Sequence, residues 1–241
     1  TLKVILDGAI ADLSKASSEN LVAVKGDVIY AGNIAKWKKA AYSVKARNAM
    51  QLSKVKATTA YTEALAAVAN GFTSNSDDMS VPWESANHNP IFQFMEQRVD
   101  VRMGATLVDM MTSLSDPRLP FYAAKDGSGS YTGSAIGSQN GEASKPGSYI
   151  AGATAPSVII TYAELKFIEA EANFMLNKTT EAKAALAEGV KASVMKATGS
   201  TTFDQAWYDS KIGSQTLSLE LIMTQKYIAT FGTNQAYADY R

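Results

Sequence analysis

The sequence predicts an all-α fold in which helical hairpins carry long irregular loops, and three observations predict it. Apolar residues recur at intervals of three and four over much of the 241 residues. A short turn joins at least two of these helical stretches, so that the two helices must lie antiparallel. Two segments, 71–101 and 121–157, have instead the polar, Gly- and Pro-containing composition of loops. We expect a single α-helical domain over residues 1–241.

The first 70 residues predict three helices. Residues 2–16 predict a surface helix with one buried stripe that includes Ile5. Residues 33–57 predict a longer helix with seven basic residues and no acid, and a packed helix with a solvated face explains this pattern better than a membrane-binding helix. Its expected buried residues are Ile34, Trp37, Ala41, Val44, Leu52 and Val55. An Ala-rich helix over 58–70 follows, which Gly71 can end in a left-handed conformation.

The C-terminal half predicts a helical hairpin. A short helix is expected over 102–114 and another from Thr161, where Glu164 is placed to complete a capping box. The buried stripe of that second helix should consist of Leu165, Ile168, Ala172 and Met175. The partner helix covers 180–196, and small residues at Ala170, Ala182 and Gly189, with Leu186, fit part of a tetratricopeptide register, although Lys166 and Asn173 do not.

The remaining segments predict shorter elements. A helix should open at Thr202 with Gln205 in the capping-box position, and a last helix should cover 216–231. Residues 148–150 and 158–160 have the β-branched and aromatic composition of strands.

Composition excludes several classes of function. The 23 basic residues equal the 23 acidic residues, so net charge offers no case for nucleic-acid binding. The longest apolar runs are shorter than the roughly 18 residues that a membrane span needs. There is no cysteine, which excludes thiol catalysis and thiolate metal sites.

Catalytic and cofactor chemistry finds little support. The single histidine, His88, has no evident nucleophile and carboxylate partner for a triad. The acid pairs Asp77-Asp78 and Glu169 with Glu171 are better explained as solvated carboxylates than as a glycosidase pair. Calcium at Asn75, Asp77 and Asp78 is slightly more plausible than catalysis, because hard cations favour clustered oxygens, although the EF-hand spacing is absent. The glycines from Gly127 to Gly133 lack the Lys-Ser or Lys-Thr of a phosphate loop. We expect no enzyme activity, no cofactor and no metal.

The loops do carry the side chains of a sugar-binding site. Sugars present flat apolar faces edged by hydroxyl groups, so such sites combine aromatic rings with amide or charged groups. The predicted ligand-binding residues are Trp83, Asn87, Asn89, Tyr131, Gln139, Asn140 and Tyr149. A buried, loop-anchoring role is an equal alternative for Trp83, and we expect Phe92 and Phe94 to lie in the core.

Several segments resemble the SusD/RagB-like glycan-binding outer-membrane lipoproteins, in the same order along the chain. The resemblance is carried by 26–39, 89–109, Ser115-Asp116-Pro117-Arg118-Leu119-Pro120, 160–172 and 226–241. It implies a scaffold of degenerate tetratricopeptide hairpins and a non-catalytic protein. It further implies a lipid-anchored protein on the surface of a Gram-negative bacterium that binds an oligosaccharide and acts as a lid over a SusC-like TonB-dependent transporter. The matching segments contain none of the family's ligand residues, so none is transferred.

The resemblance leaves the ligand open. Peptide-binding members are an alternative, as is a helical-repeat scaffold that binds a protein partner. A glycan-cleaving enzyme is a weaker alternative, which Glu142→Gln or Asp126→Asn would test. Because Thr1 begins inside a helical pattern and Arg241 follows one, we expect a fragment of a longer lipoprotein that lacks the lipid anchor.

Overall fold

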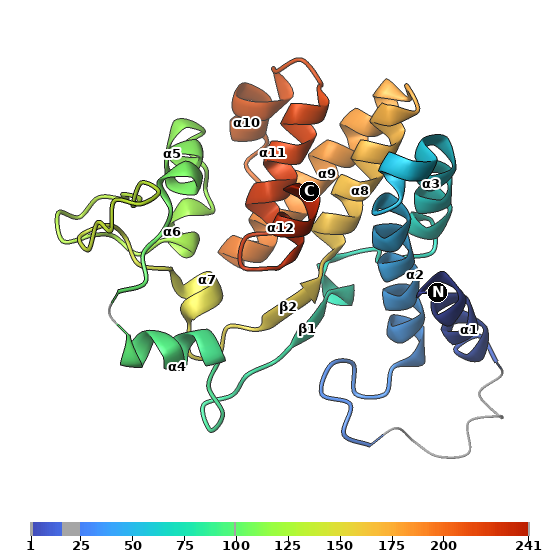
Figure 1. Ribbon diagram of the computed structural model, residues 1–241, viewed down its shortest axis with the longest axis horizontal. Coiled ribbons are helices and arrows are strands. Elements are labelled where there is room, and N and C mark those ends of the chain that lie inside the picture. The colour runs from blue at the N-terminus through green and yellow to red at the C-terminus, as the bar shows by residue number, and fades with distance from the viewer. Residues whose placement is uncertain (1, 16–24, 99, 241) are drawn as a thin grey trace. The chain divides into compact units, whose positions relative to one another are not determined.

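Helices form most of the structure, a computed structural model that describes residues 2–15, 25–98 and 100–240 (Figure 1). The predicted positions Thr1, Ala16, Val99 and Arg241 lie outside these ranges. The α-helices are α1 (Leu2–Asp12), α2 (Ile34–Met50), α3 (Ser53–Val68), α4 (Pro90–Gln97), α5 (Ala105–Ser113), α6 (Leu119–Tyr122), α7 (Ser148–Ala151), α8 (Tyr162–Met175), α9 (Thr179–Thr198), α10 (Gln205–Tyr208), α11 (Leu219–Ala229) and α12 (Gln235–Tyr240). The strands β1 (Met79–Val81) and β2 (Ser157–Ile160) pair as a small sheet. This architecture confirms the predicted helical fold class.

Contacts between Cα atoms divide the chain into two compact units. Unit 1 combines the chain up to Ser80 with residues 158–193 and the residues from Ile212 onwards. Unit 2 combines residues 81–157 with 194–211. The single domain expected from the sequence stays a prediction. No helix in the described ranges is both long and apolar enough to cross a bilayer.

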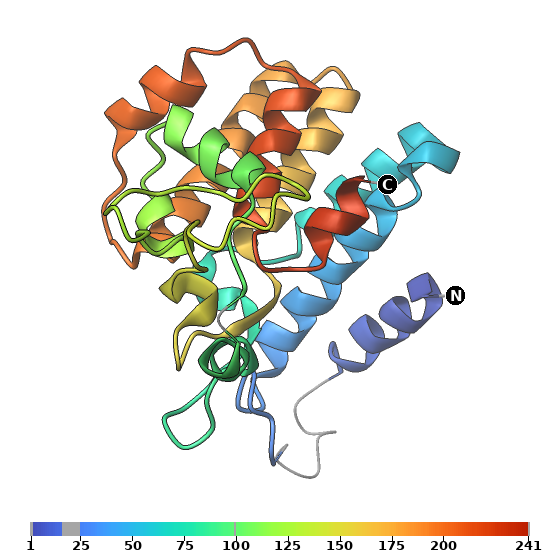
Figure 2. The same ribbon diagram turned by 60° about the vertical axis from the view of Figure 1, so that its left-hand side comes forward.

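Unit 1 is built around α8, which packs against α2, α3 and α11 (Figures 1 and 2). Leu165, Phe167 and Ile168 of α8 are buried. The neighbouring α9 approaches closely, since a Cβ atom added at Gly189 would lie 3.2 Å from the Phe167 ring. The buried small residues Ala170 and Ala182 contribute to this hairpin as expected.

The basic segment differs from the prediction in its length and in its buried face. The chain leaves the helix after Met50, and α3 contains a non-helical residue at Lys56, with φ −136° and ψ 46°. Val55 is 80% exposed. The buried residues of α2 are Ala40, Ser43, Ala46, Ala49 and Met50. Mostly small side chains face the packed neighbours because the helices approach closely there, whereas Trp37 is half-buried at the side.

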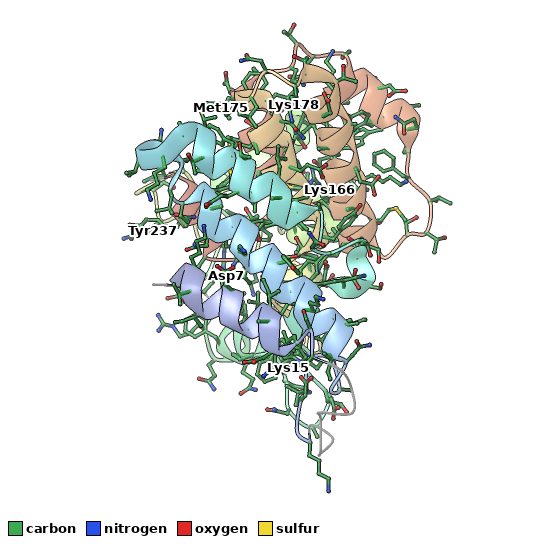
Figure 3. The ribbon with its side chains drawn as sticks, turned by 90° about the vertical axis from the view of Figure 1, so that its right-hand side faces the viewer. Asp7, Lys15, Lys166, Met175, Lys178 and Tyr237 are labelled. Atoms are coloured by element: carbon green, nitrogen blue, oxygen red, sulfur yellow. The ribbon has the colours of Figure 1, made fainter. Side chains whose placement is uncertain are left out.

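Three of the seven basic residues of this segment pair with acids from other elements, as expected for a packed helix. Lys39 Nζ lies 2.8 Å from Asp77 Oδ2, and Arg47 Nε lies 2.6 Å from Glu164 Oε1. Lys45 pairs with Asp7, which Figure 3 shows on α1 beside α2. Part of the positive charge of this segment is therefore compensated inside unit 1.

Gly71 does not end α3 in a left-handed conformation, so that prediction is wrong. A Cβ atom at this position would lie 2.7 Å from Leu165 Cδ2 and 2.8 Å from Ser43 Oγ. The glycine is needed because the chain passes close to α8 and α2, and not because of its backbone angles.

Two other helices of unit 1, α1 and α8, differ from the sequence predictions in their ends, caps or buried residues. The α1 helix ends at Asp12 and buries only Leu6 and Ile10, leaving Ile5 exposed. Thr161 caps α8 by accepting a hydrogen bond from the Glu164 backbone N–H. Glu164 itself is buried and binds Arg47, so its side chain does not complete the predicted box. Met175 is exposed at the end of α8.

Two predictions fail in unit 2. Residues 148–150 belong to helix α7 rather than to a strand. The helix expected from Thr202 begins at Gln205, because Asp204 caps it by accepting a hydrogen bond from the backbone N–H of Trp207. The strand expected over 158–160 is confirmed as part of β2.

The long loop of unit 2 follows a path set by main-chain hydrogen bonds. The Met103 N–H donates to Ser144 O and the Ser134 N–H donates to Met103 O, each at 2.8 Å. The Ala124 N–H donates to Lys145 O at 2.9 Å. Beneath it, Leu107, Val108, Met111 and Tyr122 form a buried core. The loop is thus held at its base and extends away from α5 and α6 (Figure 1).

Candidate functional site

All seven predicted ligand-binding residues lie in unit 2, where they form two groups. Trp83, Asn87, Asn89 and Tyr149 lie around the segment 148–157, and Tyr131, Gln139 and Asn140 lie in the loop between α6 and α7.

The first group is tied to the end of the long loop by side-chain hydrogen bonds. The half-buried Trp83 donates from Nε1 to Ser157 Oγ at 2.9 Å. Asn89 donates from Nδ2 to Ala155 O at 2.6 Å, and its Oδ1 accepts from the Ile91 N–H at 2.7 Å. Asn89 is 1% exposed, so its amide caps α4 and joins two segments instead of facing solvent. This burial corrects the prediction that Asn89 contacts a ligand.

Within this group, the side chain of Asn87 is free of the fold's packing and can contact a ligand. Its backbone pairs with Glu84 across a tight turn, while its side chain is exposed. The exposed amide can therefore donate to and accept from a ligand hydroxyl group.

Tyr149 lies on a rigid support. Its ring is 4.8 Å from the ring of the fully buried Tyr122, at an interplanar angle of 33°. The half-buried Tyr149 ring is thus supported by Tyr122. Close by, Asp116 and Arg118 form an ion pair with both side chains 0% exposed, with Arg118 Nη2 2.5 Å from Asp116 Oδ2.

The Asp116–Arg118 pair is joined by more than one hydrogen bond. Asp116 Oδ1 also accepts from the Arg118 backbone N–H at 2.9 Å. Burial alone would lower the pKa of Arg118, but attraction to Asp116 outweighs it and the pKa is raised. Arg118 stays charged, and the Asp-Pro-Arg sequence serves to fix the base of the site.

The second group lies on a loop that Asp126 shapes. Asp126 accepts from the Ser128 N–H at 2.8 Å, from the Ser130 N–H at 3.0 Å and from Thr132 Oγ1 at 2.7 Å. The hydrogen bonds from Ser128 and Thr132 hold the pKa of Asp126 well below its usual range. A carboxylate held in its ionised form is a poor general acid, which argues against Asp126 as a catalytic residue.

The side chains of this group differ in exposure. Tyr131 is half-buried, with Lys125 Nζ 6.0 Å from its ring centre. Gln139 and Asn140 are exposed near the tip, where Gln139 has a positive φ of 50°. Asn140 Oδ1 accepts from the Glu142 N–H at 3.0 Å, which leaves its amide N–H groups facing solvent.

The residues considered for calcium have other roles. Asp77 Oδ2 binds Lys39 Nζ and the Thr73 N–H, each at 2.8 Å. Asp78 Oδ1 accepts from the Tyr162 N–H at 2.6 Å, and Asn75 donates to Ala192 O. Within the described part of the chain, no group of three or more His, Cys, Asp or Glu residues is arranged to hold a metal ion.

Helix α4 exposes aromatic residues that the sequence analysis assigned to the core. None of its side chains is buried, and Phe94 is 49% exposed, with Arg98 Cζ 5.8 Å from its ring centre. Phe92 is half-buried and packs edge-on against His88, whose ring centre lies 5.1 Å away. These rings remain at the surface because α4 contacts little beyond the short α7.

The sequence matches a protein family described as starch-binding associating with outer membrane, SusD-like_2, over residues 2–241. The chain belongs to the SusD-like family. No curated protein matches it.

Solved structures show the same fold. A SusD/RagB family protein from Bacteroides thetaiotaomicron is 26% identical with a TM-score of 0.81, and the match covers 99% of this chain and 59% of that protein. A chitin-binding SusD homologue from Flavobacterium johnsoniae is 25% identical with a TM-score of 0.81, over 99% of this chain and 58% of that protein. A SusD homologue from Bacteroides vulgatus, 22% identical, superposes with a TM-score of 0.82 over 98% of this chain and 57% of that protein.

This SusD-like chain thus spans less than two thirds of the length of these relatives. The description of the family names binding and outer-membrane association, and it names no reaction. The named binding and outer-membrane association agree with the predicted class of outer-membrane-associated binding protein.

Proposed function

We propose that this SusD-like chain binds an oligosaccharide without chemical change, through the surface of unit 2. The contacting residues are Trp83, Asn87, Tyr131, Gln139, Asn140 and Tyr149, joined by Phe94 of α4. In the full-length protein, a lipid anchor holds this surface at the outer membrane, where the glycan passes to a SusC-like TonB-dependent transporter.

The observation that carries the proposal is the support behind Tyr149. A sugar ring stacks on an aromatic face with little loss of conformational freedom when that face is already fixed. The buried Tyr122 packs against the Tyr149 ring, while the exposed amides of the unit can bind hydroxyl groups. Such a site needs shape and hydrogen bonds, and no acid with a perturbed pKa.

A binding screen with starch and chitin oligosaccharides tests the proposal. These two glycans are chosen because the family description names starch and one relative binds chitin. Intrinsic tryptophan fluorescence reports binding, since Trp83 lies in the proposed surface. We expect saturable binding without product formation, and Tyr149→Ala should weaken it by about tenfold, or about 1.4 kcal/mol.

Matched variants sharpen the result. Tyr227→Ala removes an exposed tyrosine from α11 in unit 1 and should leave the dissociation constant unchanged. Phe94→Ala should weaken binding less than Tyr149→Ala, because among the described residues no second ring packs against Phe94. If glycans bind Tyr149→Ala as tightly as the parent chain, the proposed surface is wrong, and peptides become the next ligands to test.

A further inference from the structure

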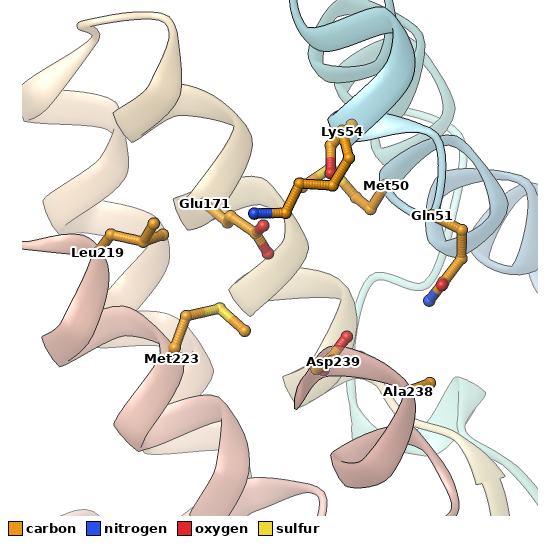
Figure 4. Close-up of a pocket in the computed structure, with 9 residues that line it drawn as sticks. Met50, Gln51, Lys54, Glu171, Leu219, Met223, Ala238 and Asp239 are labelled. Atoms are coloured by element: carbon orange, nitrogen blue, oxygen red, sulfur yellow. The ribbon is translucent and has the colours of Figure 1, made fainter. Parts of the chain in front are cut away.

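The charged groups around the pocket of unit 1 compensate one another (Figure 4). Glu171 and Asp239 both pair with the buried Lys226, at nitrogen–oxygen distances of 3.5 and 3.0 Å. Lys54, which also lines the pocket, attracts the carboxylate of Glu171 and lies beside it in Figure 4. The two acids are thus matched by two cations. This pocket indicates no ligand, and a reactive group lies instead in the long loop of unit 2.

Two asparagines are each followed by a glycine, at Asn70-Gly71 and at Asn140-Gly141. The side-chain carbonyl carbon of an asparagine can be attacked by the backbone nitrogen of the next residue, which closes a succinimide ring. Glycine favours this attack because, without a Cβ atom, its backbone can approach closely and adopt the required angles. Local sequence makes both pairs reactive, so the fold decides which of them reacts.

The turn at Asn140 holds the reacting groups close together. Asn140 Oδ1 accepts a hydrogen bond from the Glu142 backbone N–H at 3.0 Å, so the side chain folds back over the intervening Gly141. This places Asn140 Cγ beside the nitrogen of Gly141, the arrangement that ring closure needs. The Glu142 N–H also donates to the oxygen that becomes negatively charged during the attack, which stabilises that charge.

The rest of the turn is anchored while the attacking nitrogen is accessible. The Asn140 N–H donates to Ser134 Oγ at 3.2 Å, and Arg102 Nε donates to the Gly141 carbonyl oxygen at 2.6 Å. Among the described residues, none accepts a hydrogen bond from the Gly141 N–H. Asn140 and Gly141 are both exposed, so water can remove the proton of this N–H and later hydrolyse the ring.

The pair Asn70-Gly71 is held in the opposite way. The Gly71 N–H donates to Val68 O at 3.0 Å, and Asn70 Nδ2 donates to Ala66 O at 3.3 Å, at the end of α3. A Cβ atom at the buried Gly71 would lie only 2.7 Å from Leu165 Cδ2. Ring closure here would break the hydrogen bond of the attacking nitrogen and disturb packed side chains, so this asparagine should be preserved.

We propose that Asn140 is a site of spontaneous deamidation in the folded chain. The Gly141 nitrogen forms a bond to Asn140 Cγ and gives its proton to water. The Cγ–Nδ2 bond then breaks, and Nδ2 takes up a proton and leaves as ammonia. One water opens the succinimide: attack at the former side-chain carbonyl leaves aspartate, and attack at the main-chain carbonyl leaves isoaspartate, whose backbone is longer by one methylene group.

The modification changes the proposed glycan surface, a consequence that rests on the proposed function. Asn140 loses the amide N–H groups that face solvent and gains a negative charge near the tip of the loop. The isoaspartate form also lengthens the backbone next to Gln139. Both products should weaken glycan binding, so the affinity of the surface should fall as the chain ages.

Peptide mapping by mass spectrometry after incubation of the folded chain in neutral buffer tests the proposal. The two pairs fall on different tryptic peptides, because Arg98 and Lys125 lie between them, and electron-transfer fragmentation distinguishes isoaspartate from aspartate. We expect Asn140 to convert at least about tenfold faster than Asn70, since small losses of alignment have effects of this size. In urea the two should convert at similar rates. Equal rates in the folded chain, or the same preference for Asn140 in urea, would overturn the proposal.

Two alanine variants separate the reaction from the fold. A Cβ atom added at Gly141, or at Gly127 in the same loop, meets no atom within 4 Å, and neither glycine has a positive φ. Both variants should therefore keep the parent melting temperature. Gly141→Ala should slow the conversion of Asn140 at least about tenfold, because the methyl group hinders the attacking nitrogen. Gly127→Ala should leave the rate unchanged. An unchanged rate in Gly141→Ala would overturn the proposal.

Binding of starch and chitin oligosaccharides before and after incubation tests the consequence for the surface. Incubation should weaken binding by the parent chain by about three- to tenfold, the effect of losing one hydrogen-bond donor. Asn140→Gln should keep its affinity, because the longer side chain closes the ring much less readily. Equal weakening of Asn140→Gln would contradict this consequence. If the fresh chain binds no glycan, the proposed function fails, whereas the mass measurement still decides the deamidation.

Discussion

The two units of this SusD-like chain are held together in different ways. In unit 1, ion pairs and hydrogen bonds join residues far apart in sequence: Arg47 binds Glu164 across 117 positions and the Tyr162 N–H binds Asp78 across 84. In unit 2, the buried ion pair joins Asp116 to Arg118 two positions away, and main-chain hydrogen bonds hold the long loop. Long-range ion pairs therefore help to assemble unit 1, whereas in unit 2 main-chain hydrogen bonds and hydrogen bonds from side chains such as Trp83 and Asn89 join distant segments.

This difference bears on function. Main-chain hydrogen bonds do not consume side chains, so the exposed residues of unit 2 are available to a ligand. In unit 1, by contrast, most charged groups of α2 already have partners within the unit.

The largest effects should come from removing one partner of each buried ion pair. Arg47→Met leaves Glu164 uncompensated in unit 1, and Arg118→Met does the same to Asp116 in unit 2. Each should lower the free energy of unfolding by about 3 to 5 kcal/mol in urea titrations. Lys166→Met is the control, since its pair with Glu169 is more exposed and should contribute less than about 1 kcal/mol.

Hydrogen exchange tests whether each variant destabilises only the unit in which its ion pair lies. Arg47→Met should accelerate amide exchange in α2 and α8, and Arg118→Met should accelerate it in α5, α6 and the loop that follows. If both variants accelerate the same amides, the two units open together and the contrast between them is lost.

A smaller effect should follow from adding a methyl group at two glycines. At Gly147 the Cβ atom would lie 2.4 Å from Phe121 O, a backbone atom, whereas at Gly71 its nearest neighbours are side-chain atoms of Leu165 and Ser43. Side chains can rotate away and the loop backbone cannot, so Gly147→Ala should destabilise more than Gly71→Ala, each within about 1 to 3 kcal/mol. Thermal unfolding measures the destabilisation caused by each variant. A larger destabilisation by Gly71→Ala than by Gly147→Ala would show that the loop backbone can shift.

Unit 1 was the more predictable part of the fold. Helical spacing and the Thr161 cap located α8, and small residues indicated the close hairpin with α9. The partner of Glu164 could not be predicted, because local sequence places this acid in a capping box and only the fold brings Arg47 to it.

The candidate site was predictable in residue type but not in exposure. Asn89 followed by Pro90 is the sequence of a helix start, with a capping side chain and a proline in the first turn. This signal could have identified α4, assigned Asn89 to a structural role and left Phe94 at the surface. The supporting role of Tyr122 depends on packing between α6 and α7, which no local pattern encodes.

The smallest effect on stability is expected from replacing either of two tryptophans whose indole N–H groups donate to different acceptors. In unit 1, Trp37 donates to Asp27 Oδ2 at 2.7 Å, and in unit 2, Trp207 donates to Leu114 O at 2.9 Å. The hydrogen bond from Trp37 is the main reason that the pKa of Asp27 is lowered to about 2. Trp37→Phe should therefore raise this pKa toward 3.8, as followed by NMR of the carboxyl carbon.

The pH dependence of stability should separate the two variants. Because the pKa of Asp27 is lower in the folded chain, this group stabilises the folded chain at pH values above its unfolded pKa of about 3.8. The contribution disappears as the pH falls toward about 2. The destabilisation caused by Trp37→Phe should consequently shrink over that interval, while the destabilisation caused by Trp207→Phe, whose acceptor is a carbonyl, should stay constant. A constant difference for Trp37→Phe would mean that packing against Tyr30, whose ring centre lies 5.2 Å away, is what Trp37 contributes to unit 1.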